Sequence, residues 1–361
     1  MAVRRRARDA ASLDRSHLRP RREEQLLLDA LPNLPGKRIL CTTSGRAQFA
    51  FAAAERSQDV EVECNFLDLY QAELAREAAP PETPNLHITC SSNLPDGPFD
   101  AAVLPFYRNG EAELARERMQ DAYLRLVDGG QMWTAVDSAK DTWLLQEMKK
   151  LFDHVEIHKD KKGVLYQAVK QGPLRRERNF SCEFVFRDGP LLIKGFSRPG
   201  VFAHRRVDVG ARKLMEMMEI KPGDRVLDLG CGTGAISLAA AHRAERVHVL
   251  AVDSNARALE CVQRGAALNN LTNIETELTC TGVGPQHAPF NLVLANPPYY
   301  SGYRIAQLFL DTARASLCPG GRLLLVTKAP SWFAENVPLQ FIGTEIYQLK
   351  EYYVISAWAR G

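Results

Sequence analysis

The stretch Gly223-Asp-Arg-Val-Leu-Asp-Leu-Gly-Cys-Gly-Thr-Gly234 predicts a buried strand, a glycine-rich turn and the start of a helix. An earlier stretch, Gly36-Lys-Arg-Ile-Leu-Cys-Thr-Thr-Ser-Gly-Arg-Ala47, has the same layout with fewer glycines. Alanine-rich helices are expected after both, over residues 47–55 and 235–244. Because a chain of 361 residues is long enough for two domains, the two stretches indicate a degenerate internal repeat.

The repeat extends through the rest of both halves. Residues 99–104 and 290–295 are predicted to be matching buried strands, and each half then closes with two strand-like runs. Alternating strands and helices predict right-handed crossovers and a mostly parallel sheet, and the closing runs predict an antiparallel hairpin at one edge. The expected fold class is therefore α/β, with two tandem Rossmann-like domains. The closing runs are residues 155–158 with 164–169, and residues 345–349 with 352–358.

The two copies differ where their strands end, which is the edge where a doubly wound sheet binds its ligand. Without glycines in the turn, the backbone cannot approach a ligand closely. We therefore expect the first copy to have kept the fold and lost the site. The first copy has Cys41, Thr43, about Asn65, and Pro105 where the second copy has Asp228, Gly230, Asp253 and Asn296.

The glycine loop of the second copy, Gly230-x-Gly232-x-Gly234, is a candidate cofactor site that is ambiguous by itself. The same pattern fits a nicotinamide dinucleotide, whose pyrophosphate would bind at the helix N-terminus. Two carboxylates favour S-adenosyl-L-methionine instead. Asp228 lies just before the first glycine and can reach the amino group of that cofactor directly or through water. Asp253 ends the next strand, where it can accept hydrogen bonds from both ribose hydroxyls.

The motif Asn296-Pro297-Pro298-Tyr299 follows a predicted strand and is a candidate catalytic loop. Two prolines cannot continue a strand, so a loop with a fixed backbone begins here. An amine conjugated to a purine or an amide is a poor nucleophile, because its lone pair is delocalised. The Asn296 side-chain carbonyl and the Pro297 backbone carbonyl can each accept one of its N–H groups and align it with a methyl donor. Tyr299 offers an aromatic face that can stack on a base.

The stretch Arg198-Pro-Gly-Val-Phe-Ala-His-Arg-Arg-Val-Asp-Val-Gly-Ala-Arg212 precedes the glycine loop. With the Asn-Pro-Pro-Tyr motif and the duplicated layout, it resembles the ribosomal RNA guanine-N2 methyltransferases of the small-subunit methyltransferase C and large-subunit methyltransferase G type. The resemblance covers residues 26–361. It implies two class I methyltransferase domains, the first degenerate and supporting folding and RNA docking. It also implies N2-methylguanine as product, S-adenosyl-L-methionine as cofactor, a ribosomal RNA or ribosomal subunit as partner, and Phe202 and Asp208 at the cofactor entrance.

Charge and turn signals divide the chain further. Up to Arg22 the chain carries eight arginines and two aspartates, a composition too polar to fold alone. This tail is either an arm that contacts RNA phosphates or a solvated segment without function. Asp188-Gly189 between alternating apolar runs predicts a β-hairpin. We expect a disordered basic tail over residues 1–25, a degenerate methyltransferase-like domain over 26–171, a linker and β-hairpin over 172–200, and a catalytic methyltransferase domain over 201–361.

Composition also limits the compartment and the cofactors. No apolar run reaches the roughly 18 to 20 residues that a membrane span needs, and no signal-peptide core follows the start. The eight cysteines are scattered without a C-x-x-C pair, and the histidines do not cluster, so no metal site is expected. The sequence therefore indicates a cytoplasmic protein with reduced thiols that acts in ribosomal RNA processing. Nothing in it specifies an oligomeric state, and a monomer is compatible with it.

Two alternative functions remain open. Methylation of a glutamine side chain in a protein, or of adenine N6 in nucleic acid, relies on the same Asn-Pro-Pro-Tyr motif. A non-catalytic RNA-binding or assembly factor would keep the fold and have lost turnover. The intact Asp253 and Asn296 argue against loss of turnover, and the duplicated body favours ribosomal RNA as the substrate.

Overall fold

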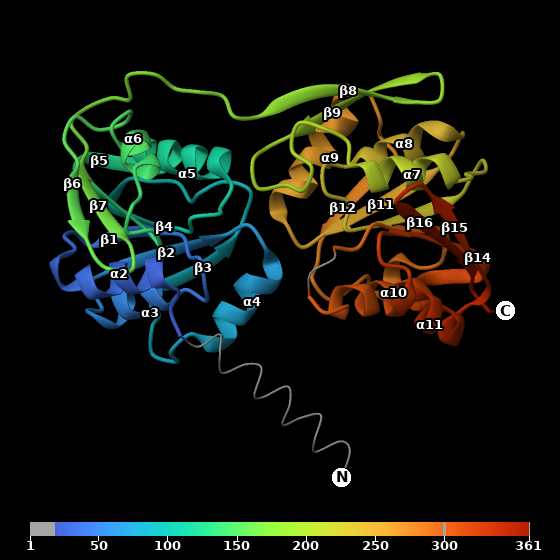
Figure 1. The fold of residues 1–361 in the computed structure, drawn as a ribbon, viewed down its shortest axis with the longest axis horizontal. Coiled ribbons are helices and arrows are strands. Elements are labelled where there is room, and N and C mark those ends of the chain that lie inside the picture. Colours follow the sequence, from blue (N-terminus) through green and yellow to red (C-terminus); the bar gives the residue numbers. More distant parts are fainter. Residues whose placement is uncertain (1–18, 299–300, 361) are drawn as a thin grey trace, which may run out of the picture. The chain divides into compact units, whose positions relative to one another are not determined.

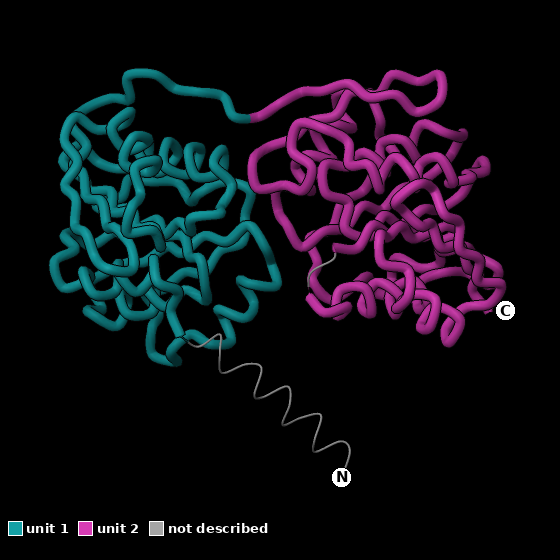
Figure 2. The backbone as a smooth tube through the Cα atoms, viewed as in Figure 1, with its two compact units in different colours: residues 1–180 teal, residues 181–361 magenta. Residues whose placement is uncertain are grey.

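The computed structural model describes residues 19–298 and 301–360, and the chain divides into two compact units, residues 1–180 and 181–361 (Figures 1 and 2). Tyr299 of the expected catalytic loop lies outside the described residues. Most of the expected N-terminal tail lies outside them too. Helix α2, however, begins at Arg22, so the last residues of the span expected to be tail are helical.

The first unit is a seven-stranded sheet with helices packed on it. Its strand order is β3-β2-β1-β4-β5-β7-β6, in which β7 runs antiparallel to both of its neighbours and the other pairs are parallel. The strands are β1 (Arg38–Cys41), β2 (Glu61–Phe66), β3 (Leu86–Cys90), β4 (Phe99–Phe106), β5 (Leu126–Val136), β6 (Glu156–Lys159) and β7 (Val164–Val169). The helices are α2 (Arg22–Ala30), η2 (Leu31–Asn33), α3 (Gln48–Glu55), α4 (Leu69–Ala78), α5 (Ala112–Arg125) and α6 (Trp143–Met148).

The second unit repeats this architecture. Its sheet has the order β12-β11-β10-β13-β14-β16-β15, again with one antiparallel hairpin at the edge. The predicted internal repeat and fold class are therefore confirmed. The strands are β10 (Arg225–Leu229), β11 (His248–Asp253), β12 (Ile274–Leu278), β13 (Phe290–Ala295), β14 (Leu317–Thr327), β15 (Ile342–Leu349) and β16 (Tyr352–Trp358). The helices are α7 (Val209–Met217), α8 (Ala235–Arg243), α9 (Ala256–Leu268), η3 (Pro285–His287), α10 (Arg304–Ser316) and α11 (Ser331–Gln340).

Strand register gives the equivalence of the two units residue by residue. At the end of the second strand, the first unit has Phe66 where the second unit has Asp253. The expected counterpart, Asn65, is one residue too early, and a one-residue shift along a strand moves a side chain to the opposite face. An apolar ring therefore replaces the ribose-binding carboxylate expected in the second unit. The pairs that set this register are Cys41 with Cys64 and Asp228 with Ala251.

Side chains of the second sheet alternate between two helical layers. Along β10, Val226 packs in the cluster that contains α7 and α8, whereas Leu227 and Leu229 pack with α10 and α11 (Figure 1). Asp228 points to the α8 side, where it is fully buried and accepts a hydrogen bond from Ser237. The strand therefore holds a carboxylate near its end, although its other buried residues are apolar, and this suits a role other than packing.

A β-hairpin opens the second unit, as Asp188-Gly189 predicted. Strands β8 (Cys182–Asp188) and β9 (Leu191–Ser197) pair antiparallel. The hairpin is tied to the helices of this unit, because Arg243 of α8 makes two hydrogen bonds of 2.7 and 2.9 Å to the Asp188 carboxylate. Asn269, after α9, bonds both the N–H and the carbonyl of Lys194. The hairpin is thus part of the second unit rather than a free linker.

Among residues 19–298 and 301–360, no helix combines the length and the apolar composition that crossing a membrane requires.

Candidate functional site

The candidate site lies at the carboxyl edge of the second sheet. Leu229, the last residue of β10, is in register with Val252 on one side and with Ala295, the last residue of β13, on the other. The loops that follow β10, β11 and β13 therefore all begin at the same edge of the sheet. The strand order reverses between β10 and β13, and such a switch point is where doubly wound sheets bind ligands.

The glycine loop after β10 is held to the end of β11. Gly230, Gly232 and Gly234 all have positive φ angles, of 73°, 53° and 80°. The N–H of Gly232 donates to Asp253 Oδ2 at 2.9 Å, and the N–H of Asn255 donates to Asp253 Oδ1 at 2.8 Å. Asp253 therefore organises two loops through backbone hydrogen bonds. This is the carboxylate predicted from the sequence to accept hydrogen bonds from the ribose hydroxyls.

Asp228 is a buried carboxylate directly behind the glycine loop. Its Oδ2 accepts a hydrogen bond of 2.5 Å from the Ser237 hydroxyl, whereas its Oδ1 is buried and accepts none from the described residues. Burial raises the pKa of Asp228, the Ser237 hydrogen bond opposes this shift and the charge of Asp253 adds to it, so that the pKa is about 7. The site thus contains a carboxyl group that lacks one donor and that changes protonation near neutral pH.

Asn296, the first residue after β13, is held by a residue of another element. Its Nδ2 donates to Asp208 Oδ2 at 3.0 Å, and the same oxygen accepts the N–H of Ala211 at 3.1 Å, capping helix α7. The sequence analysis expected Asp208 at the cofactor entrance. The structure brings it into contact with the side chain predicted to orient the methyl acceptor.

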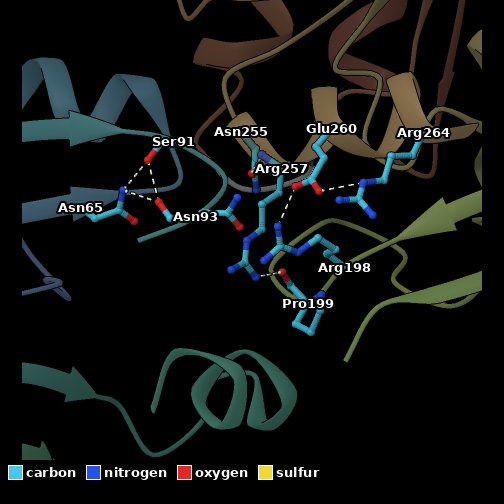
Figure 3. A network of polar contacts seen from close by, with 9 residues as sticks. All are labelled: Asn65, Ser91, Asn93, Arg198, Pro199, Asn255, Arg257, Glu260 and Arg264. Atoms are coloured by element: carbon cyan, nitrogen blue, oxygen red, sulfur yellow. Dashed lines mark hydrogen bonds and ion pairs between the residues drawn. The ribbon is translucent and has the colours of Figure 1, made fainter. Parts of the chain in front are cut away.

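The segment between β9 and α7 is anchored next to the glycine loop by helix α9 (Figure 3). Arg257 Nη1 donates to the carbonyl of Pro199 at 2.6 Å, and Asn255 Nδ2 donates to the carbonyl of Gly200 at 2.7 Å. Phe202 follows and is 65% exposed. A Cβ atom built on Gly232 would lie 3.8 Å from the Phe202 carbonyl oxygen, so this aromatic residue borders the loop.

An ion-pair network fixes the start of the same segment (Figure 3). Arg198 Nη1 lies 2.7 Å from Glu260 Oε2, and Arg264 Nε lies 3.0 Å from Glu260 Oε1. The Arg198 residue is 9% exposed, so this arginine binds helix α9 instead of presenting its charge to solvent. Through this network, helix α9 supports the loop that carries Phe202.

The described part of the catalytic loop continues into an aromatic cluster. Pro297 is buried and Pro298 half-buried. The Tyr303 ring, at the start of α10, stacks on the Trp332 ring of α11 with centroids 5.0 Å apart and an interplanar angle of 6°. Tyr303 is 42% exposed. An aromatic pair is therefore present at the starts of α10 and α11, the helices that follow β13 and β14.

The equivalent edge of the first unit is filled by that unit's own side chains. Glu24 of α2 is fully buried and accepts hydrogen bonds from the Thr43 hydroxyl and from the N–H of Phe49 in α3. Burial raises the pKa of Glu24, and the two hydrogen bonds oppose the shift. Asn65 also bonds within this unit, since its Nδ2 donates to Ser91 Oγ at 2.8 Å (Figure 3).

Sequence reasoning missed the residues that support the site. Ser237, Asn255 and Arg257 have no motif, and Arg257 has the charge of a surface residue although its side chain is fully buried. Among the described residues, no group of three His, Cys, Asp or Glu side chains is placed to hold a metal ion. The supporting residues could be found only by seeing which backbone atoms they bind.

The second unit matches a known protein family. The family model of the methyltransferase small domain matches residues 193–356. A ribosomal RNA small subunit methyltransferase C of Stutzerimonas stutzeri is 33% identical over 158 residues, which are 42% of this chain and 45% of that protein. The methyltransferase C of a Marinomonas species is 28% identical over 63% of this chain and 68% of its own length. The alignment with the Stutzerimonas protein thus spans about half of its length.

A solved structure covers nearly the whole chain. The 16S rRNA N2 methyltransferase (RsmC) of T. thermophilus, in complex with AdoMet and guanosine, superposes with a TM-score of 0.72 and 20% identity, over 92% of both chains. At this identity the likeness establishes the fold alone, namely two tandem Rossmann-like α/β domains in one chain. Together with the sequence matches, it confirms the resemblance that the motifs indicated.

Proposed function

We propose that the second unit transfers a methyl group from S-adenosyl-L-methionine to the exocyclic N2 amine of guanine in ribosomal RNA. The observation that carries the proposal is the position of Asn296. Asn296 follows the end of β13, where Asp208 holds its amide, and β13 pairs with β10, the strand that leads into the glycine loop. An acceptor for amine hydrogens and a loop suited to a nucleoside cofactor thus occupy one sheet edge.

The residues of the glycine loop fit the proposed cofactor. Asp228 Oδ1 is buried without a donor from the described residues, and the cofactor's ammonium group, or a water between them, supplies one. Asp253, the last residue of β11, is a carboxylate that can accept hydrogen bonds from ribose hydroxyls. Space next to Gly232 is open, because a Cβ there would have no atom closer than 3.8 Å. The bound cofactor would supply a methyl group already activated by a positively charged sulfur.

The chain contributes alignment and hydrogen bonding rather than a strong base. Asn296 Oδ1 and the Pro297 carbonyl accept the two N–H groups of the guanine amine, which directs its lone pair and favours the positive charge that develops on nitrogen. Pro297 and Pro298 fix the backbone that presents these acceptors. Tyr299 and the exposed face of Tyr303 offer surfaces on which an extruded base can stack.

Support for guanine and ribosomal RNA comes from the relatives. The curated relatives are named for ribosomal RNA small subunit methylation, and the T. thermophilus enzyme was solved with AdoMet and guanosine. The duplicated body is common to that enzyme and this chain. The first unit would then support folding and RNA docking. The eight cysteines are free thiols, which supports action in the reducing cytoplasm.

The experiment is methyl transfer with several acceptors in parallel. The protein is incubated with tritium-labelled S-adenosyl-L-methionine and with naked 16S or 23S rRNA, isolated ribosomal subunits, or a protein extract. Nucleoside and amino-acid digestion should yield labelled N2-methylguanosine. Labelled N6-methyladenosine or methylglutamine would identify one of the alternative acceptors, and absence of transfer to every acceptor would favour a non-catalytic RNA-binding factor.

A further inference from the structure

We infer that Asp208 is a positioning residue that fixes the orientation of the Asn296 amide, so that Oδ1 rather than Nδ2 faces the methyl acceptor. The inference rests on the proposed function and assigns a role to a residue outside the Asn-Pro-Pro-Tyr motif. Asp208 and Asn296 are 88 residues apart in the chain, and the contact between them joins the start of α7 to the end of β13.

Hydrogen-bond chemistry determines which end of the amide points to Asp208. A carboxylate can only accept hydrogen bonds, so the atom of Asn296 that faces it must be the NH₂ donor. The carbonyl oxygen then faces the other way. Without such a partner, an amide side chain can rotate by half a turn and present NH₂ instead. That orientation would place donors against the donors of an exocyclic amine and prevent the alignment that the reaction requires.

The surroundings leave little room for another arrangement. A Cβ atom on Gly210 would lie 2.9 Å from Asp208 Oδ2, 3.3 Å from Asn296 Oδ1 and 3.1 Å from Tyr352 Cε1. The pair therefore packs against a position of α7 that has no side chain, next to the ring of Tyr352, which is 7% exposed. Gly210 is in a helix, where glycine costs about 1 kcal/mol relative to alanine, so close packing gives a reason for its presence.

The first unit offers an internal comparison, because α2 corresponds to α7. The residue that precedes α2 is Arg21, whose side chain makes no capping hydrogen bond, and Pro105 occupies the position of Asn296. The unit that lacks the amide thus also lacks the carboxylate that would hold it. If Asp208 served only to cap a helix, the carboxylate would not be expected to be absent from the unit that lacks the amide.

Helix capping can be separated from orientation by exchanging Asp208 for serine. Serine is a good N-cap, and its side chain is too short to reach Asn296. We expect Asp208→Ser to lower kcat about 10-fold to 100-fold, as misplaced reacting groups do, while the Kd for S-adenosyl-L-methionine stays within about threefold. Asp208→Asn keeps an oxygen for both bonds and should recover most of the lost kcat.

The matched control is Asp68→Ser in the first unit. Asp68 caps α4, a helix of the first unit, through a 3.0 Å hydrogen bond from the N–H of Gln71. Asp68→Ser should change the thermal midpoint as little as Asp208→Ser does, and it should leave kcat unchanged. A second test is Gly210→Ala, which keeps the charge and favours the helix but crowds the pair. It should also lower kcat, and because the added methyl favours the helix while it crowds the pair, kcat rather than the thermal midpoint is the deciding measurement.

Two results would overturn the inference and leave the proposed function standing. One is wild-type kcat in both Asp208→Ser and Gly210→Ala when Asn296→Ala is inactive. The other is loss of cofactor affinity with unchanged kcat in Asp208→Ser, which would place Asp208 at the cofactor entrance. Wild-type activity in Asn296→Ala would instead contradict the proposed function itself. If Asp208→Ser fails to fold, Asp208→Asn and Gly210→Ala still decide between these outcomes through kcat.

Discussion

Asp228 combines burial with an incomplete set of hydrogen bonds. A buried carboxylate without donors for all of its acceptors is destabilised in its charged form, and burial accordingly raises its pKa to about 7. Structures normally pair such groups, so the missing donor at Oδ1 points to a ligand or a bridging water. The residue is thus better explained by binding than by stability.

This shift predicts how stability depends on pH. The folded-state pKa of about 7 lies above the ordinary aspartate pKa of 3.8, so the folded chain binds more protons than the unfolded chain between these values. The contribution of Asp228 is full below pH 3.8 and is lost as the pH rises through about 7. Relative to Asp228→Asn, the thermal midpoint of the wild type without cofactor should therefore fall across this range. A difference that stays constant with pH would refute the shift.

The predicted cofactor site depends on the conformation of a whole loop, the one between β10 and α8. Gly234 begins α8 with a left-handed φ of 80°, and a Cβ there would lie 2.8 Å from Val262 Cγ2 of α9. Gly223, before β10, has a similar φ of 83°, but its Cβ would meet no atom within 4 Å. Position 234 therefore needs glycine for both its conformation and its close packing, whereas position 223 needs it for conformation alone.

The pair of glycines gives a matched test. Gly223→Ala should cost about 1 to 2 kcal/mol of unfolding free energy, the penalty for a left-handed alanine, and leave cofactor binding unchanged. Gly234→Ala should cost more and should also weaken cofactor binding, because α8 must shift away from α9. Denaturant unfolding and calorimetry measure both quantities. Equal losses in the two variants would contradict the close approach of α8 and α9.

At the scale of the whole molecule, the two units share a strand order and differ at the three polar positions assigned to the site. Cys41, Phe66 and Pro105 stand where the second unit has Asp228, Asp253 and Asn296. Glu24 binds the start of α3 from within the first unit. The duplicated fold therefore carries one candidate site.

We accordingly expect the full chain to bind one S-adenosyl-L-methionine. Titration calorimetry should give a stoichiometry near one, and Asp253→Ala should remove the binding, since it releases the glycine loop and the loop after β11. A stoichiometry near two, or binding that persists in Asp253→Ala with wild-type affinity, would mean that the first unit retains a site.

The sequence predicted the repeat, the strand alternation and the edge hairpins because these follow from local patterns of apolar residues, glycine and proline. It also identified the glycine loop and Asn296, whose residue types follow from chemistry. The contact between Asp208 and Asn296 and the burial of Arg257 could not be predicted in this way, because each depends on segments far apart in the chain. The counterpart of Asp253 was misplaced by one residue, since local patterns do not determine strand register.

The central claim is that a methyl group is transferred to guanine N2 at Asn296. Its most direct test is single-turnover transfer to ribosomal RNA by wild type and Asn296→Ala, with cofactor affinity measured on the same preparations. The account predicts that Asn296→Ala lowers the rate of N2-methylguanosine formation by about 10²-fold or more, with the cofactor Kd within about threefold of wild type. Formation of N2-methylguanosine at the wild-type rate by Asn296→Ala would contradict it.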